Sequence, residues 1–551
     1  MEATLNHSYQ VDVLVVGGGL AGLVAAQKAV DRRRSVMILD QEGEKSLGGQ
    51  AFWSLGGLCM IDTPEQRRMK IHDSKELATQ DWYGSAQFDR AEDANPRAFA
   101  NAYLDFASSE MRSWLYSIGM RWFPVVGWAE RGGGNADGHG NSVPRFHLTW
   151  GTGPGVVAPF ERQVRQAHAN GHLELKFRHR ATGIDLKRKV INGEILEPTT
   201  AERGQSTSRA VIGEFTVSAD SIIITSGGIG GDHNAVRKLW PTDRLGPAPQ
   251  RMVAGVPDYV DGQMQHVIKA AGGGAINEDR MWHYCEGVAN WDPIWPNHGI
   301  RILPGPSSLW FDANGERMEA PYLPGFDTLG TLKRILSTGH EHSWFILTQK
   351  IIEKEFALSG SEQNPDFTSG KWIEVLKSRL GKGATGPVEA FKEHGKDFVV
   401  KNTLEELVAS MNAITPNAML NFEKICSQIE ARDREITNTF TKDAQITAIR
   451  GARNYLGDRL IRTAKPHKIL DPNAGPLIAV RLNILTRKSL GGLHTNIKSQ
   501  LLDDNGNVID GIYAAGEVCG FGGGGYHGYN ALEGTFLGGC IFSGKIAGEN
   551  A

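Results

Sequence analysis

The residues best suited by type and spacing to form a ligand site lie near the end of the chain, in residues 516–539. This stretch has ten glycines in 24 residues. Glycine at this density suits a backbone that turns sharply or approaches a ligand closely. Polar and aromatic side chains lie between the glycines, which distinguishes the stretch from a plain flexible linker: Tyr526, His527, Tyr529, Asn530 and Glu533. We therefore expect this stretch to form one wall of a ligand site.

A second glycine-rich turn, residues 17–22, lies near the start of the chain. It follows a β-rich apolar run at residues 11–16 and precedes a segment with helical spacing of apolar residues. The next strand ends in Asp40, 18 residues after Gly22. A strand, tight turn, helix, strand and acid in this order are typical of a dinucleotide site, where the helix N-terminus faces a pyrophosphate and the acid binds ribose. The expected contacts are Gly17, Gly19, Leu20, Ala21, Gly22 and Asp40.

Further segments favour FAD over NAD as that dinucleotide. Residues 44–57 form another glycine-rich loop directly after the second strand, where a longer cofactor must continue towards its flavin. Residues 220–231 indicate a buried strand that ends in glycines, and residues 510–518 indicate a late strand that ends at Glu517. A helix beginning near Glu533 would direct its positive N-terminus at the flavin. The remaining expected FAD contacts are Gln41, Gly48, Gly49, Gln50, Ser54, Gly56, Gly57, Gly227, Gly228, Gly516, Glu517, Ala531 and Leu532.

Composition narrows the choice of function. The chain has 551 residues and a formal net charge of -3, so no electrostatic argument favours nucleic acid as a partner. It has no run of 18 apolar residues, and its first residues lack the pattern of a signal peptide, so we expect a cytoplasmic protein. The five cysteines are scattered without metal-binding spacing, so we expect no metal site.

These segments resemble the flavoprotein family that contains succinate dehydrogenases, fumarate reductases and 3-ketosteroid dehydrogenases. QAFWSLGG and WGTGP are most similar to actinobacterial ketosteroid-dehydrogenase-like proteins. The resemblance implies an α/β fold with a discontinuous Rossmann-like FAD-binding domain, residues 1–285 and 441–551. An α+β catalytic domain, residues 286–440, would interrupt it, with a helical region beginning at about residue 342.

The resemblance also implies site residues. Tyr322 matches the family's catalytic tyrosine base, and Tyr529 matches a tyrosine that donates to the substrate ketone, with Tyr526 as the alternative register. Glu533 replaces a family glycine whose backbone amide contacts the same ketone. Ala531 replaces an arginine that holds a carboxylate in the dicarboxylate enzymes, which disfavours succinate or fumarate. No histidine lies near Ser46 and Leu47, where the family attaches flavin, so we expect noncovalent FAD.

The predicted function is an FAD-dependent dehydrogenase acting on a CH–CH bond next to a ketone, most similar to 3-ketosteroid 1-dehydrogenases. The substrate would be an apolar ketone such as a steroid, and the electron acceptor is unknown. The alternatives are an enoate or fumarate-type reductase and a flavin-binding protein without dehydrogenase activity. His494 and Arg487 flank the SLGG segment. Either could touch the flavin or the substrate, and a structural role is as plausible for both.

Overall fold

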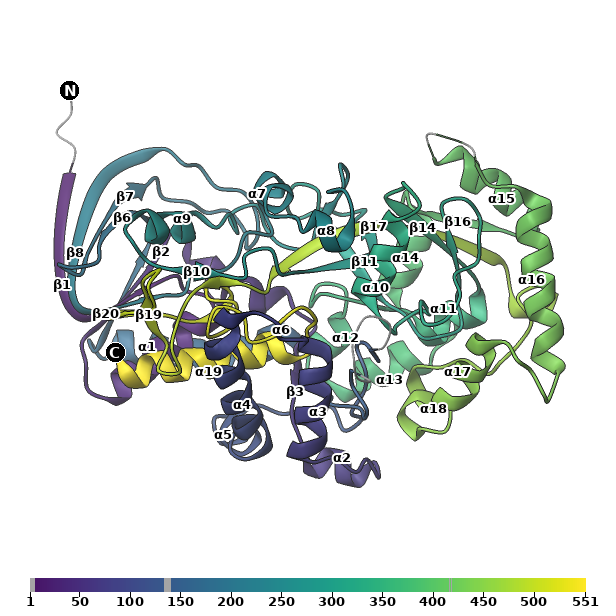
Figure 1. Ribbon diagram of the computed structural model, residues 1–551, viewed down its shortest axis with the longest axis horizontal. Helices are drawn as coiled ribbons and strands as arrows, with labels where there is room; N and C mark the ends of the chain where they lie inside the picture. Colours follow the sequence, from purple (N-terminus) through teal and green to yellow (C-terminus); the bar gives the residue numbers. More distant parts are fainter. Residues whose placement is uncertain (1–4, 133–139, 416, 418) are drawn as a thin grey trace.

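A mostly parallel sheet forms the half of the molecule that contains both chain ends (Figure 1). The computed structural model describes residues 5–132, 140–415, 417 and 419–551. β1 (Leu5–Val16) lies between β2 (Val36–Asp40) and β8 (Val211–Ile224), parallel to both. β5 (Leu173–Phe177) extends the sheet beyond β2, and β20 (Val508–Ala514) extends it beyond β8. The α/β class predicted from the sequence is confirmed.

The two faces of this sheet are covered by different elements. Val13 and Val15 of β1 belong to one buried cluster, while Leu14 and Val16 belong to another, because side chains alternate along a strand. The first face is covered by α1 (Leu20–Asp31), α6 (Thr152–Ala169) and α19 (Thr535–Asn550). The second packs on α9 (Gln263–Ala270) and on residues of β6 (His179–Asp185) and β7 (Val190–Leu196), which pair with each other and join the same sheet through β8. α1 packs directly on α19, so the two ends of the chain are joined in one core.

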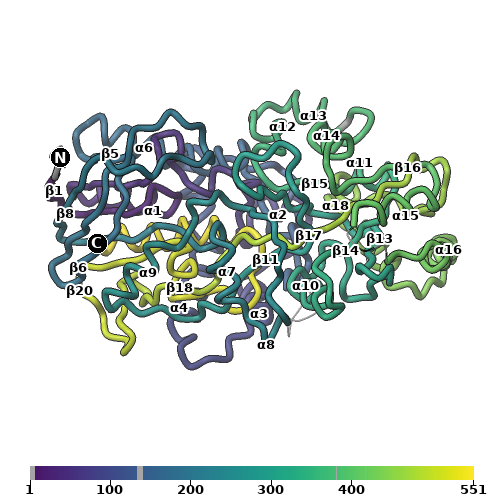
Figure 2. Tube along the Cα trace, turned by 90° about the horizontal axis from the view of Figure 1, so that it is seen from above, coloured from purple at the N-terminus to yellow at the C-terminus, as the bar shows by residue number. Residues whose placement is uncertain are grey.

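A second sheet lies towards the opposite end of the molecule (Figures 1 and 2). Its long central strand, β17 (Leu477–Ser489), pairs antiparallel with β11 (Met281–Ala289) and β14 (His342–Thr348). The other strands of this sheet are β9 (Val253–Ala254), β12 (Gly299–Leu303), β13 (Leu309–Asp312), β15 (Ala357–Leu358) and β16 (Phe398–Lys401).

Two sequence expectations differ from this arrangement. Residue 342 was expected to begin a helical region, but it begins β14, since Trp344, Phe345 and Ile346 are buried between neighbouring strands; the helix α11 (Gln349–Glu355) follows. The expected domain boundary at residue 286 falls inside β11, and β17 joins the second sheet although it lies beyond residue 441. The exact domain division stays a prediction.

The remaining elements are short strands and helices around the two sheets. The strands are β3 (Gly57–Cys59), β4 (Phe146–Leu148), β10 (Ala275–Ile276), β18 (Gly492–Leu493) and β19 (Gln500–Leu502). The helices are α2 (Pro64–Arg68), α3 (Lys75–Ala86), α4 (Ala94–Ser108), α5 (Met111–Ser117), α7 (His233–Lys238), α8 (Thr242–Leu245), α10 (Thr328–Leu336), α12 (Pro365–Thr368), α13 (Trp372–Leu380), α14 (Gly386–His394), α15 (Leu404–Ala413), α16 (Phe422–Thr437), α17 (Ala444–Ala452) and α18 (Leu456–Ile461).

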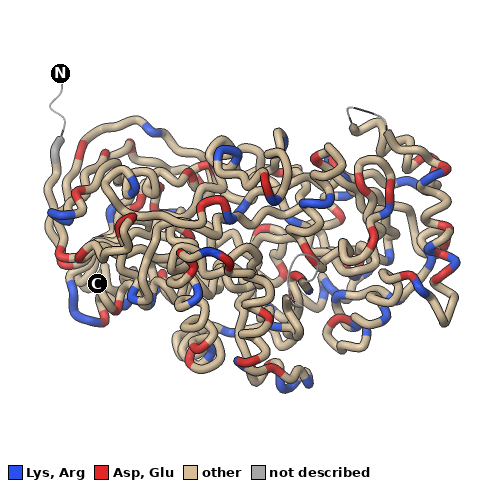
Figure 3. Tube along the Cα trace, in the orientation of Figure 1, with Lys and Arg blue, Asp and Glu red and all other residues tan. Residues whose placement is uncertain are grey.

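Charged residues of both signs are interspersed along the chain (Figure 3), in keeping with the small net charge. Among the described residues, no helix combines the length and the apolar character needed to cross a bilayer.

Candidate active site

A pocket is lined by residues of both sheets. Its walls include the turn after β1, the loop after β2, Tyr284 of β11, Arg301 and Leu303 of β12 and the turn before α19. Gly19 and Asp40 from the first sheet therefore share one cavity with Tyr284 and Arg301 from the second. A ligand in this cavity would contact both halves of the molecule.

The turn between β1 and α1 fits the phosphates of a dinucleotide. A Cβ at Gly17 would lie 2.6 Å from the carbonyl oxygen of Thr225, and one at Gly22 would lie 2.1 Å from the carbonyl oxygen of Gly17. These two glycines allow strand, turn and helix to pack closely. A Cβ at Gly19 would instead meet nothing within 4 Å. Gly19 thus faces open space at the N-terminus of α1, where unpaired backbone N–H groups favour an anion.

Asp40 is fixed at the carboxyl end of β2. Its Oδ2 accepts a hydrogen bond from the Gly18 N–H at 2.9 Å, and its Oδ1 accepts one from the Glu42 N–H at 2.8 Å. Burial raises the pKa of Asp40 to about 6, although these two hydrogen bonds oppose the shift. The carboxylate retains lone pairs that can accept the hydroxyl groups of a ribose.

Glu517 organises another wall of the pocket. Its Oε1 accepts the Ser489 N–H at 2.9 Å, and its Oε2 accepts hydrogen bonds from Gln50 at 3.3 Å and Lys488 at 3.2 Å. A Cβ at Gly228 would lie 2.2 Å from Oε1, so the glycine makes room for this carboxylate. Loops far apart in the sequence are thereby held around one cavity.

Several buried polar atoms of the pocket lack a partner among the described residues. They are the hydroxyl of Tyr259, Nε2 of His179 and Nε1 of Trp53. Buried polar groups normally have hydrogen-bond partners, because an unpaired group costs roughly 1–3 kcal/mol. A polar cofactor such as FAD can supply partners, and together with the open space at Gly19 these atoms fit that group.

An acid–base cluster occupies the part of the pocket formed by β11, β12 and the turn before α19. Oε1 of Glu533 accepts hydrogen bonds from the guanidinium of Arg301 at 2.6 Å, the hydroxyl of Tyr284 at 3.0 Å and Nε1 of Trp282 at 3.3 Å. Burial and the negative charge of Glu533 raise the pKa of Tyr284 well above its ordinary value, so Tyr284 keeps its proton. Tyr284, Arg301 and Glu533 all line the pocket.

Two further buried carboxyl groups surround Arg301. Glu130 Oε2 lies 3.4 Å from one of its nitrogens, and Glu286 Oε2 lies 3.8 Å from another. Burial raises the pKa of both glutamates, and the charge of Glu533 raises them further. One guanidinium thus faces three acids, two of which are biased towards their protonated forms.

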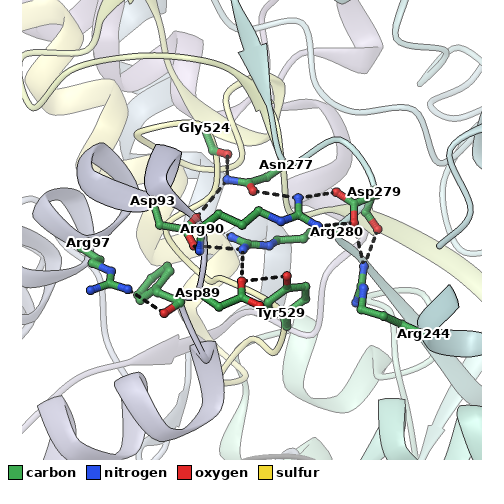
Figure 4. A network of polar contacts seen from close by, with 11 residues as sticks. Asp89, Arg90, Asp93, Arg97, Arg244, Asn277, Asp279, Arg280, Gly524 and Tyr529 are labelled. Carbon is green, nitrogen blue, oxygen red and sulfur yellow. Dashed lines mark hydrogen bonds and ion pairs between the residues drawn. The ribbon is translucent and has the colours of Figure 1, made fainter. Parts of the chain in front are cut away.

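The predicted ketone donor Tyr529 lies in a different environment (Figure 4). Its hydroxyl donates to Asp89 Oδ1 at 2.9 Å. Its ring faces the guanidinium groups of Arg280 at 4.1 Å and Arg244 at 4.5 Å, with Arg90 at 5.6 Å. Three cations on one aromatic ring hold the glycine-rich stretch against neighbouring loops.

The other two predicted catalytic tyrosines, Tyr526 and Tyr322, are not among the residues that line the pocket in the described part of the chain. Tyr526 is fully buried, donates to the carbonyl oxygen of Thr535 at 2.7 Å, and has its pKa raised by burial. Tyr322 is half-buried and packs on the main core. Among the described residues that line the pocket, none of Tyr322, Tyr526 and Tyr529 is found. Their catalytic roles stay predictions without support from this geometry.

Most of the predicted FAD contacts line the pocket: Gly17, Gly19, Leu20, Ala21, Asp40, Gln41, Gly49, Gln50, Ser54, Gly56, Gly57, Gly227, Gly516 and Glu517. Others support it from behind: Gly22, Gly48, Gly228, Ala531 and Leu532. A Cβ at Gly48 would lie 2.6 Å from Val157, and Ala531 and Leu532 are part of the hydrophobic core. Direct FAD contact by this second group stays a prediction.

Sequence reasoning missed most of the acid–base cluster. Tyr284 lies in a strand whose eight residues 281–288 are all buried, so no alternation of polar and apolar residues identifies it. Arg301 lies in a similarly buried strand. A buried arginine is rare without a partner, and this was the available signal that acids lie nearby. His494, for which the sequence left a flavin or substrate contact and a structural role both open, forms a hydrogen bond with Asn95 at 2.9 Å.

Comparisons with solved structures agree with this architecture. The 3-ketosteroid Δ4-(5α)-dehydrogenase of Rhodococcus jostii superimposes with a TM-score of 0.62 at 17% identity, over 98% of this chain and 96% of that one. The 3-ketosteroid Δ1-dehydrogenase of Sterolibacterium denitrificans gives a TM-score of 0.67 at 14% identity, over 98% and 99% of the two chains. At this identity the likeness establishes a shared fold.

Sequence relatives extend the comparison. A KsdD-like steroid dehydrogenase of Mycobacterium tuberculosis is 55% identical over 543 residues, which cover 98% of this chain and 95% of the relative. One from Mycolicibacterium smegmatis is 56% identical over 529 residues, covering 96% of each. The profile of the FAD binding domain family matches residues 12–537. The chain therefore belongs to the FAD binding domain family, and it is an FAD-dependent oxidoreductase.

Proposed function

We propose that the chain is a dehydrogenase that removes two hydrogens from adjacent carbons beside the ketone of a steroid. The observation that carries this proposal is the acid–base cluster of Tyr284, Arg301 and Glu533 in the same pocket as the FAD-binding turn. The mycobacterial relatives, named as steroid dehydrogenases, support the substrate class because they match nearly the whole chain.

FAD, when bound, supplies the hydride acceptor, so the protein must accept the accompanying proton. Glu533 is positioned for this role because its Oε1 accepts the hydroxyl of Tyr284 at 3.0 Å within the pocket. Tyr284 can relay the proton: its oxygen takes the substrate proton while its own proton passes to Glu533, 3.0 Å away. The net result is a protonated Glu533 and an unchanged Tyr284.

Arg301, Glu130 and Glu286 would let the site release the proton that Glu533 has accepted. Arg301 is 2% exposed at its side chain and holds Glu533 in place. Protonation of Glu533 removes a negative charge that raises the pKa values of Glu130 and Glu286, so either acid can then release a proton more easily. The buried cluster therefore keeps Arg301 neutralised in both states of the reaction, which limits the cost of a buried unpaired charge.

The proposal includes the cofactor linkage and the domain arrangement expected from sequence. FAD is held noncovalently by the residues that line the pocket. Residues 1–285 and 441–551 chiefly bind the cofactor, and the part between them chiefly closes the substrate site. A cytoplasmic location and an unidentified electron acceptor complete the proposal.

The test is anaerobic single-turnover reduction of the purified flavoprotein by a panel of 3-ketosteroids. Bleaching of the oxidised flavin by at least one saturated or monounsaturated ketosteroid, with formation of a new carbon–carbon double bond, is the expected result. Complete absence of bleaching across the panel, in protein that a chemical reductant still bleaches, would refute the steroid assignment.

A further inference from the structure

The basic side chains of the pocket differ in whether an acidic side chain forms an ion pair with them. Arg180 pairs with Glu194 at 2.5 Å, Arg301 with Glu533 at 2.6 Å, and Lys488 with Glu517 at 3.2 Å. Arg487 also lines this pocket. Within the described part of the chain, it forms no ion pair within 4.0 Å and no hydrogen bond through its side chain.

The position of Arg487 is built into the fold. It lies near the end of β17, and a Cβ at Gly255 would come within 3.2 Å of its Cγ and 3.3 Å of its Cδ. The glycine therefore leaves a path for the arginine stem along the pocket wall. Arg487 is half-buried. A guanidinium that has lost part of its hydration without gaining an anion is unfavourable, so an anionic ligand at this point would be bound favourably.

Neighbouring acids do not neutralise Arg487. Burial raises the pKa of Glu362 to about 7, and the positive charge of Arg487 opposes this rise without an ion pair being formed. The same charge opposes the raised pKa of Tyr284. Leu485, two residues before Arg487 in β17, pairs with Tyr284 of β11, so Arg487 lies on the strand next to the acid–base cluster.

We propose that Arg487 is a carboxylate subsite and that the ketone substrate carries a carboxylate which Arg487 binds. This inference rests on the proposed function and narrows its substrate to acidic ketosteroids. A planar guanidinium can hold a carboxylate through two parallel hydrogen bonds, which would fix the orientation of the steroid as well as its affinity. Arg301 cannot take this role, because Glu533 already occupies it.

The experiment compares two ligands that differ in one group: a 3-ketosteroid with a side-chain carboxylate and its methyl ester. Each is used in its dehydrogenated form, the product of the proposed reaction, which cannot reduce the flavin. It is titrated into oxidised holoenzyme, and the dissociation constant is read from the change in the flavin spectrum. Wild type should bind the acid roughly 10- to 100-fold more tightly than the ester, the range expected for a charge-assisted hydrogen-bonded pair. The preference should weaken as salt increases.

Three variants identify the residue. Arg487→Met should bind both ligands equally and keep its FAD content. Arg487→Lys keeps the charge without the planar fork and should retain part of the preference. Arg251→Met, at an exposed arginine outside the pocket lining, should behave as wild type. If Arg487→Met does not fold, Arg487→Lys and the salt dependence of the wild type still decide the question.

Several outcomes would overturn the inference. One is equal binding of acid and ester by wild type, and another is a failure of either ligand to perturb the flavin. A third is an unchanged preference for the acid in Arg487→Met; a shifted flavin reduction potential in the same variant would assign Arg487 to the cofactor's own anionic groups. Failure of the proposed function is distinct, because the dehydrogenated acid would still bind while the corresponding saturated acid would leave the flavin oxidised.

Discussion

Glu533→Gln tests the proton acceptor of the proposed reaction. The substitution keeps the size and a hydrogen-bond acceptor for Tyr284 and Arg301, but it removes the negative charge on which proton transfer depends. A positioned general base typically contributes 10²- to 10⁴-fold, so we expect the rate of flavin reduction by a ketosteroid to fall by roughly that factor. The fall corresponds to about 3–5 kcal/mol in activation free energy.

The same substitution perturbs a buried ion pair, so its effect on stability must be separated from its effect on rate. Removing one partner of such a pair costs roughly 3–5 kcal/mol when the other charge is left alone. Here Glu130 and Glu286 remain 3.4 Å and 3.8 Å from Arg301. Loss of the Glu533 charge lowers their pKa values, so one can ionise beside Arg301. We therefore expect a smaller loss of about 1–3 kcal/mol.

The assay is stopped-flow flavin bleaching under anaerobic conditions, with chemical denaturation of the same holoenzyme samples. Glu430→Gln, at an exposed glutamate of α16, is the matched control. Glu533→Gln should retain FAD and ligand binding while losing the fast bleaching. A wild-type rate in a variant with full FAD occupancy would refute the assignment of Glu533 as proton acceptor.

Four other predictions follow from the pocket and its surroundings. Gly19→Val should fold but purify without flavin, because its side chain enters the open space where the cofactor is expected to bind. Gly22→Ala should instead destabilise the fold itself. Flavin absorbance and thermal melts distinguish the two variants, and a yellow Gly19→Val protein would contradict the first prediction. Acid precipitation of the wild type should release FAD into the supernatant, and flavin retained in the pellet would contradict noncovalent binding. Burial lowers the pKa of His147 to about 4 from 6.5, so the unfolded chain takes up a proton first as pH falls. The stability advantage of the wild type over His147→Gln should be full above pH 6.5 and shrink by up to ~3 kcal/mol towards pH 4. A pH-independent difference in the free energy of unfolding would argue against this. Tyr322→Phe and Tyr529→Phe should each slow flavin reduction less than about tenfold, well short of the loss expected for a general base; a larger loss in either would restore its predicted catalytic role.

The cofactor half of the molecule was predictable because its signals are local. Residues 11–40 contain strand, glycine turn, helix and acid in one continuous segment. Even there, β1 begins at Leu5 rather than near residue 11, since the earlier residues gain partners along the distant strand β8. The strand at residue 342 was missed for a similar reason. Its paired residues in β13 and β17 lie up to 141 positions away along the chain, and no local pattern encodes such pairing.

The catalytic side of the pocket was less predictable. Family resemblance directed attention to Tyr529, but three nearby arginines and Asp89 engage this residue. Glu533 was noticed only as a departure from a family glycine, because its partners Tyr284 and Arg301 lie more than 230 residues away. Side chains that meet only in the folded state carry no shared sequence pattern within one chain. Arg487 was noticed through its place beside the SLGG segment, but its lack of a counter-ion required the structure.

The pairing of β8 with β20 sets the order in which a newly made chain can become a flavoprotein. β8 ends at Ile224 and β20 begins at Val508, so at about 5–20 residues per second the ribosome needs roughly a quarter of a minute to a minute to make the intervening chain. During this interval the edge of β8 and the face of α1 that α19 later covers remain exposed. Gly516 and Glu517 also complete the cavity only at the end. Capture of FAD would thus mark the molecules whose synthesis had been completed.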